Sequence, residues 1–215
     1  MRKRVKYPLY LADRYIMAID PKKFSPIAVS DTCSVWNILS SQKLFQAAKS
    51  AKVHFCITPM VLFECLLKPR SMMTSEKDEL ITRLKKARED GHFPTQECEL
   101  NDLVELARKA PSGLGSGEIS CIATAYRIQS IAFMTDEKKA RRFAESKLSL
   151  TVETTPKLYA WLHFNYCLSD GDHLDIISEH EIYEKRPLTK FFQEAFEEAL
   201  RCRLMDSSTL AKLDE

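Results

Sequence analysis

The chain lacks any uninterrupted apolar segment of about eighteen residues, the length that a membrane-spanning helix needs. Its basic N-terminal segment has no continuous apolar core and no small-residue cleavage site, which argues against a signal peptide. The seven cysteines are scattered and include no C-x-x-C pair, so neither a disulfide framework nor a zinc site is indicated. These absences predict a cytoplasmic protein with reduced thiols and no membrane association.

Several common site motifs are also missing. No P-loop, dinucleotide fingerprint or nucleophile elbow is present. The five histidines are dispersed, and no two have metal-ligand spacing. His173 lies among acids in SDGDHLD, which lacks the spacing of a calcium loop, and we interpret this segment as a turn. Three of the five glycines stand together in PSGLGSGE, residues 111–118, where the backbone must bend sharply.

What is present is an ordinary globular composition. The 215 residues are 45% hydrophobic and 29% charged, which is enough for one large domain with a buried core. The net charge of +2 hides two basic clusters, one in the first six residues and one at residues 138–142. Such clusters are compatible with phosphate contacts, but they also occur on solvated surfaces, so they do not identify a partner by themselves.

Strand-like and helical patterns alternate along the chain. Because this alternation is typical of a parallel sheet flanked by helices, we predict a three-layer α/β/α fold with a central, mostly parallel sheet of four to five strands. The helix at residues 59–68 is apolar nearly all round and is therefore expected to be buried. The expected strands are residues 26–30, 53–58, 131–135 and 148–154, and the other expected helices are residues 32–40, 41–50, 118–130, 137–146 and 155–167.

We expect one domain, residues 26–180, with additions at both ends and in the middle. Residues 1–25 are predicted to form an irregular N-terminal extension, and residues 70–112 an insertion of two amphipathic segments. Residues 181–215 contain an amphipathic helix with three phenylalanines on its apolar face, followed by a tail. We expect this helix to pack on the domain; the alternative is a docking surface for a second copy or another protein.

Four acids stand at comparable points of successive strand–helix units. Asp31 ends the first strand, and Asp136 ends the third. Glu64 lies in the helix after the second strand, and Glu118 opens the helix after the glycine-rich segment. Because the carboxyl ends of parallel strands share one edge of a sheet, these four acids are expected to converge there.

Each acid also has a structural explanation that must be weighed. Asp31 and Asp136 fit helix N-caps as well as they fit a catalytic role. Glu118 lies in a first helical turn, where its charge suits the helix dipole, and taken singly this interpretation is favoured. Glu64 is different, because an unpaired carboxylate in an apolar helix is costly to bury and needs a cation, a metal or water at its tip.

Crowded carboxylates repel one another unless a hard cation lies between them. Oxygen-rich sites of this kind suit Mg²⁺ or Mn²⁺. Such ions activate water and stabilise the attacking and leaving oxygens of a phosphodiester. The four acids as a set therefore indicate metal-dependent phosphodiester hydrolysis more strongly than any one of them does.

The segments that carry these acids resemble the motifs of the PIN-domain family of metal-dependent ribonucleases. SDTCSVWNIL, with Asp31, is similar to the opening aspartate motif, and TPMVLFECL, with Glu64, is similar to the second motif. GSGEISCIATAYR, with Glu118, resembles the third, and FMTDEKKARRFA, with Asp136, resembles the fourth. The match runs in the right order over roughly residues 27–170.

The resemblance implies hydrolysis of RNA by a metal-activated water. Asp31, Glu64, Glu118 and Asp136 would be the catalytic residues and metal ligands, with Glu137 as a further ligand. Many related proteins are toxins restrained by an antitoxin, so an antitoxin, another protein or a second copy of the chain are candidate partners. The residues implied in RNA binding are Thr32, Ser34, Asn37, Thr135, Lys138, Lys139, Arg141 and Arg142.

Two classes of function follow from the sequence. The first is an active, Mg²⁺- or Mn²⁺-dependent endoribonuclease, such as a toxin or a defence nuclease. The second is a non-catalytic PIN-like module that binds RNA or a protein. The presence of all four acids favours the enzyme, because a module without chemistry has no need for Glu64 in an apolar helix.

Overall fold

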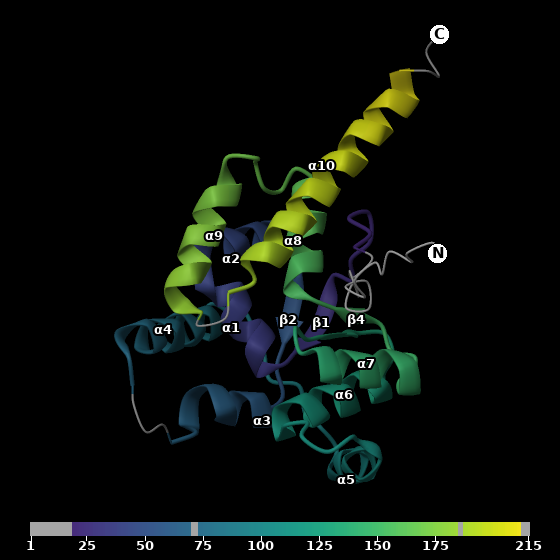
Figure 1. Cartoon of the computed structure of the whole chain (residues 1–215). Coiled ribbons are helices and arrows are strands. Elements are labelled where there is room, and N and C mark those ends of the chain that lie inside the picture. Colours follow the sequence, from purple (N-terminus) through teal and green to yellow (C-terminus); the bar gives the residue numbers. More distant parts are fainter. Residues whose placement is uncertain (1–18, 70–72, 185–186, 212–215) are drawn as a thin grey trace, which may run out of the picture.

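The computed structural model describes residues 19–69, 73–184 and 187–211. Its centre is a four-stranded sheet in which all strands are parallel, in the order β2-β1-β3-β4 (Figure 1). The predicted parallel α/β architecture is thereby confirmed, whereas most of the predicted N-terminal extension lies outside the described residues. The strands are β1 (Ile27–Ser30), β2 (His54–Cys56), β3 (Ala132–Met134) and β4 (Val152–Glu153).

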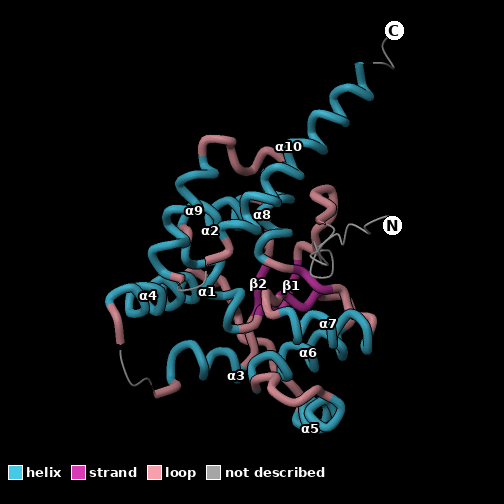
Figure 2. Tube along the Cα trace, viewed as in Figure 1, coloured by secondary structure: helices cyan, strands magenta, loops and turns pink. Residues whose placement is uncertain are grey.

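Helices cover both faces of the sheet (Figures 1 and 2). One layer contains α3 (Pro59–Leu62), α5 (Leu100–Lys109), α6 (Ser116–Ile128) and α7 (Lys138–Leu148). The other contains α1 (Thr32–Ser40), α2 (Gln42–Ser50), α4 (Ser75–Glu89), α8 (Thr155–Phe164), α9 (Asp172–Tyr183) and α10 (Thr189–Ala211). None of the described helices is both long enough and apolar enough to cross a membrane.

At the carboxyl edge of the sheet, short oxygen-bearing side chains cap the helices that follow the strands. Asp31 follows β1 directly, and its carboxylate accepts a hydrogen bond from the Ser34 amide, which starts α1. Thr58 follows β2 and accepts from the Val61 amide, which starts α3. Because these caps sit where the strands end, the polar residues around them gather at one edge of a core that is otherwise apolar.

The segment predicted as a buried helix at residues 59–68 differs from that prediction. After α3 the backbone widens into a π-helical turn, η1 (Phe63–Leu67), in which the Lys68 amide donates to the Phe63 carbonyl. Met60, Phe63 and Leu67 are 39%, 47% and 68% exposed. The prediction of all-round burial was wrong, because an apolar sequence does not by itself show that a neighbour covers each of its faces. π-Helical turns inside helices often mark functional sites.

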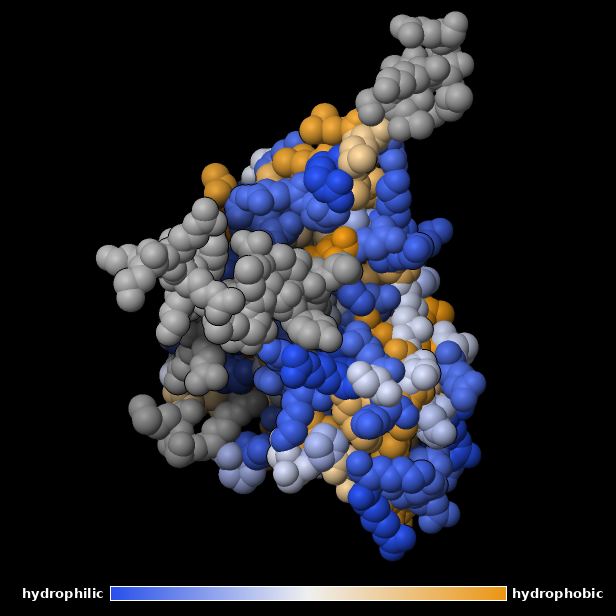
Figure 3. Space-filling model, turned by 45° about the vertical axis from the view of Figure 1, so that its right-hand side comes forward, coloured by the Kyte–Doolittle hydropathy of each residue, from blue (hydrophilic) through white to orange (hydrophobic). Residues whose placement is uncertain are grey.

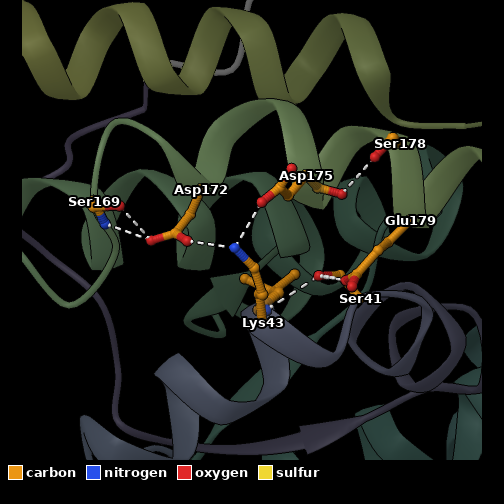
Figure 4. Close-up of polar contacts among 8 residues, drawn as sticks. Ser41, Lys43, Ser169, Asp172, Asp175, Ser178 and Glu179 are labelled. Carbon is orange, nitrogen blue, oxygen red and sulfur yellow. Dashed lines mark hydrogen bonds and ion pairs between the residues drawn. The ribbon is translucent and has the colours of Figure 1, made fainter.

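Beyond α8, α9 is attached to α1 and α2, and α10 packs on α8 and α9; Figure 4 shows the polar contacts of α9. The Lys43 ammonium lies between the carboxylates of Asp172 and Asp175, at 2.9 and 2.7 Å. The Ser41 hydroxyl donates to Glu179 at 2.6 Å. Exposed ion pairs of this kind stabilise a protein by less than about 1 kcal/mol each, so the apolar contacts of α9 and α10 carry most of the attachment.

The segment around His173 is not the turn that we predicted. His173 lies in the first turn of α9 and is buried. The side-chain nitrogen of Gln193 donates to Glu197, so the side-chain oxygen of Gln193 faces His173. This oxygen accepts a hydrogen bond from His173 Nε2–H at 2.7 Å. Nδ1 then accepts from the Tyr159 hydroxyl at 2.5 Å. The prediction was wrong because the partners of His173 come from α8 and α10, which are not near it in the sequence.

His180 joins the segment before α10 to α1. Its Nε2 accepts a hydrogen bond from the Leu188 amide at 2.9 Å. Its Nδ1 lies 2.6 Å from the Ser40 hydroxyl, whose own hydrogen is donated to the Asn37 carbonyl. Nδ1–H is therefore the donor, and His180 is held neutral as one tautomer. Burial lowers its pKa to about 4.

His163 on α8 is buried between the rings of Tyr159 and Phe196, and within the described residues neither of its nitrogens has a hydrogen-bond partner. Burial lowers its pKa from 6.5 to about 4. Below pH 6.5 the imidazole of His163 is therefore protonated in the unfolded chain, whereas in the folded chain it stays neutral down to about pH 4. His163 thus lowers the stability of the fold as the pH falls through this window, and has no such effect at pH 7.5.

We expect His163→Leu, which is similar in volume, to remove this pH dependence. Relative to the wild type, the variant should gain about 2 kcal/mol in free energy of unfolding between pH 7.5 and pH 5. Urea unfolding at the two pH values measures the difference, and the pH 7.5 value serves as the control for packing changes. An equal difference at both pH values would show that His163 titrates normally.

Candidate active site

Asp31 and Asp136 lie at the carboxyl edge of the sheet, and Glu64 and Glu118 lie beside it on η1 and α6. β1 and β3 are neighbours, and the Asp31 amide donates to the Met134 carbonyl at 3.1 Å, so Asp31 and Asp136 leave adjacent strand ends. Thr32, the residue after Asp31, donates from its hydroxyl to Glu64 at 2.5 Å. Asp31 thus contacts β3 through its backbone amide, and its neighbour Thr32 contacts η1 through Glu64.

Asp31 is the most buried of the acids, at 1% exposure. Its Oδ1 accepts from the Ser34 amide at 2.8 Å, and its Oδ2 accepts from the Thr135 hydroxyl at 2.5 Å. Burial raises its pKa to about 7, and the nearby charge of Asp136 adds to the rise. The N-cap interpretation is therefore confirmed for Asp31, and the cap is also a perturbed acid of the kind found at functional sites.

Asp136 is held by a different mechanism. It does not cap α7; instead its Oδ1 accepts from the Thr155 amide at 2.9 Å, in the first turn of α8. Its Oδ2 accepts from the Thr155 hydroxyl at 2.6 Å and from the Asn37 amide at 2.7 Å. Burial raises the pKa of Asp136, while these three donors act to lower it. Three fixed donors from two helices define the position of this carboxylate.

Glu64 lies on η1 and is only half-buried. Its Oε1 accepts from the Ser116 hydroxyl and the Gly117 amide, both at 3.0 Å, and its Oε2 accepts from Thr32 at 2.5 Å. The prediction that burial leaves Glu64 in need of a cation was therefore wrong, because protein donors already satisfy both of its oxygens. Its position is set by these donors and by the π-helical turn.

Gly117 makes the approach of Glu64 to α6 possible. A Cβ atom at this position would lie 2.6 Å from Glu64 Oε2 and 3.0 Å from its Cδ. Such contacts are far shorter than van der Waals separation, so only glycine fits while Glu64 stays where it is. Gly113, in the same glycine-rich segment, has a φ of 86°, which accounts for the predicted sharp bend.

Glu118 and Glu137 complete the acidic surroundings. Glu118 Oε2 accepts from the Gly115 amide at 2.6 Å, so the helix-start interpretation holds for this residue. Burial raises the pKa of Glu118, and the charges of Glu137 and Glu64 raise it further. Glu137 itself is exposed. Glu118 thus lies close enough to Glu64 and Glu137 for their charges to disfavour its ionised form.

The donor chemistry fits a hard divalent cation, since carboxylate oxygens predominate and neighbouring carboxylates raise the pKa of Asp31 and of Glu118. The side-chain arrangement, however, contains no group of three or more His, Cys, Asp or Glu residues that could hold a metal ion among the described residues. Hydroxyl and amide donors already occupy oxygens of Asp31, Glu64 and Asp136. A carboxylate oxygen that accepts one hydrogen bond keeps a second lone pair, so these donors orient the carboxylates without excluding a metal ion.

The residues predicted to contact RNA fall into two groups. Thr32, Asn37 and Thr135 donate to Glu64, Asp136 and Asp31, respectively, so they position carboxylates. Ser34 holds Asp31 through its amide. The basic residues lie on α7: Lys138, Lys139 and Arg142 are exposed along a groove, and Arg141 is half-buried and lowers the pKa of Asp136.

Sequence reasoning missed four residues that hold the acids: Gly115, Ser116, Gly117 and Thr155. Ser116 and Gly117 immediately precede Glu118, so their place in the glycine-rich segment was the available signal. Thr155 stands in the segment VETTP, residues 152–156, which is typical of a helix start, with Thr154 as the cap and Pro156 after Thr155. Nothing local, however, indicates that its donors face Asp136, which lies nineteen positions earlier.

Comparison with known proteins gives one match. A family model described as a PIN domain matches residues 27–158, which is more than half of the chain and includes all four acids. Neither the search of curated proteins nor the search of solved structures returned a match.

Proposed function

Because the chain belongs to the PIN-domain family, we propose that it is a metal-dependent endoribonuclease. PIN domains are generally nucleases, and the chain has their nuclease-type fold. The observation that carries the proposal is the pair of acids at adjacent strand ends, Asp31 and Asp136. Each is held by its own set of fixed donors, and the charge of Asp136 raises the pKa of Asp31.

Mg²⁺ or Mn²⁺ would be held by Asp31, Glu64, Glu118 and Asp136, with Glu137 as an outer ligand. When bound, such an ion supplies an activated water and stabilises charge on the reacting phosphodiester oxygens. Thr135 and the Ser34 amide keep the two oxygens of Asp31 in fixed directions. Asn37 and Thr155 do the same for Asp136. Roles as a toxin or defence nuclease, with an antitoxin or a second copy as partner, belong to the same proposal.

One observation favours the alternative of a non-catalytic module that binds RNA or a protein. Both oxygens of Asp31, Glu64 and Asp136 accept hydrogen bonds from the protein itself. A fully satisfied network of this kind keeps its shape without an ion. The two functions make opposite predictions for cleavage and for metal binding, so one set of measurements separates them.

We expect the wild type to cleave single-stranded RNA in Mn²⁺ or Mg²⁺ and to stop on addition of EDTA. Glu64→Gln should reduce cleavage by about a hundredfold or more, because it removes a charged oxygen while keeping the shape of the side chain. Glu89→Gln, at an exposed position on α4, is the matched control and should cleave like the wild type. Cleavage rates on a labelled RNA and calorimetric titration with Mn²⁺ measure both effects.

RNA binding that survives Glu64→Gln, without cleavage at any metal concentration, would establish the non-catalytic module instead. Absence of Mn²⁺ binding in both the wild type and the variant would remove the metal site from the proposal.

A further inference from the structure

A groove lies between the end of α5, the loop after it and one side of α7, with a volume of about 760 Å³. Figure 3 brings this side of the molecule forward and shows hydrophilic residues around paler and more apolar patches. Five of the described residues that line the groove are Lys or Arg, and none of them is acidic. The lining residues are Lys109, Pro111, Lys138, Lys139, Arg142, Phe143, Ser146, Lys147 and Leu148.

The groove begins where the acidic site ends. Lys138 starts α7 and follows Asp136 by two positions. The Lys139 ammonium donates to the Ser112 carbonyl, in the loop that leads to α6, and its charge lowers the pKa of Glu118. A bound polymer that extends from the acids along α7 therefore meets the cations of the groove directly. The cations at the start of α7 thus lie next to the acids of the site.

The chemistry of the groove walls suits a flexible polyanion that also has flat apolar parts. Pro111, Phe143 and Leu148 lie between the cations. A single-stranded nucleic acid presents phosphates and unpaired bases in alternation, and it binds surfaces that combine cations with apolar or aromatic contacts. A duplex keeps its bases stacked inside and offers only phosphates to such a surface. The mixed lining therefore favours a single strand.

Lys109 is the residue that extends this path beyond α7. It pairs with Glu105 at 2.5 Å, but both side chains are more than half exposed. An exposed ion pair of this kind is weak, so a phosphate can compete for the ammonium. Lys109 belongs to α5, which lies in the segment predicted as an insertion and carries no acid of the site. The groove thus assigns a role to that insertion.

We infer that this groove binds the backbone of the single-stranded RNA that flanks the scissile phosphodiester, with Lys109 and Lys147 as its outer contacts. The inference rests on the proposed function for the identity of the substrate. It goes beyond that function in naming the surface that holds the substrate and in including α5. The groove sets affinity and substrate length, whereas the acids carry out the cleavage.

The test is the double charge reversal Lys109→Glu/Lys147→Glu, made in the Asp31→Asn variant so that RNA is not cut. Fluorescence anisotropy with an unstructured RNA oligonucleotide in EDTA should show an affinity about tenfold lower or more. The slope of log K against log salt should fall by about 0.7 for each lost phosphate contact. Lys85→Glu/Lys86→Glu, which makes the same charge change on exposed residues of α4, is the matched control and should change little.

Equal losses in the groove variant and the control variant, or no loss in either, would overturn the groove. A duplex that binds as tightly as the single strand, with the same dependence on Lys109 and Lys147, would overturn the single-strand assignment. Because binding is measured without metal or cleavage, a groove effect together with an inactive wild type would leave the groove standing and reject the nuclease. Normal cleavage with no groove effect would reject the groove and leave the nuclease proposal standing.

Discussion

Asp31→Asn is expected to abolish RNA cleavage and, at the same time, to stabilise the metal-free protein at alkaline pH. The pKa of Asp31 is raised from 3.8 to about 7 by burial, so the folded protein holds a proton there that the unfolded chain has already released. The stability contributed by that proton is fully present below pH 3.8 and is lost as the pH rises to 7. At pH 8 the buried charge destabilises the fold by up to about 4 kcal/mol.

Asparagine removes this charge while keeping the contacts. Its oxygen can still accept from the Ser34 amide, since asparagine is as good an N-cap as aspartate. The Thr135 hydroxyl can accept from the new amide in place of donating to Asp31 Oδ2. We therefore expect urea unfolding in EDTA to show a stabilised variant at pH 8 and nearly equal stabilities at pH 4.

Asp90→Asn is the control for this experiment, because Asp90 is exposed at the end of α4. It should leave both cleavage and the pH dependence of stability near those of the wild type. A loss of stability in Asp31→Asn at pH 8 would mean that the Asp31 carboxylate is a purely structural cap. Unchanged cleavage in the same variant would remove Asp31 from the proposed chemistry.

Gly117→Ala is expected to impair cleavage strongly without unfolding the protein. The new Cβ would lie 2.6 Å from Glu64 Oε2, so Glu64 must move away from α6 and lose its bond to the Gly117 amide. Alanine favours a helix over glycine by up to about 1 kcal/mol, which offsets part of the strain. The expected result is a cleavage rate lower by about tenfold or more and a melting temperature close to that of the wild type.

Gly115→Ala is a close control, two positions earlier in the same segment. A Cβ there would meet Glu118 Oε2 at 3.6 Å, an ordinary contact, so the carboxylate need not move. The comparison of the two variants in cleavage and in thermal unfolding separates a local steric effect from a general loss of glycine. Equal activities would show that the position of Glu64 against α6 is not needed for cleavage.

The fold and the nearness of Asp31 to Asp136 were predictable because their signals are local. Strand ends and capping residues can be read within a few positions of Asp31 and Asp136, and parallel topology then brings these ends to one edge. The state of Glu64 was not predictable in this way. Its donors come from Thr32 and from Ser116 and Gly117, which lie far from it in the sequence.

The same reason explains the error at His173 and the omission of Thr155. Polar residues around His173 suggest a turn, but the contacts that bury it are made by Tyr159 and Gln193 on other helices. Thr155 has the sequence context of a helix start, and only the pairing of β4 with β3 brings its amide and hydroxyl to Asp136. Sequence patterns specify elements well, whereas contacts between distant elements depend on the assembled fold.

The helix α8 has two duties that cannot be separated in evolution. Its first turn fixes Asp136 through Thr155, while its later residues, among them Tyr159 and His163, pack against Phe192 and Phe196 of α10. A substitution that reshapes the packing at one end can shift the helix and therefore the acid at the other. Selection for stability in the C-terminal helices and selection for the chemistry of the site therefore act on different residues of one helix. Changes there are expected to be accepted in compensating pairs, not one at a time.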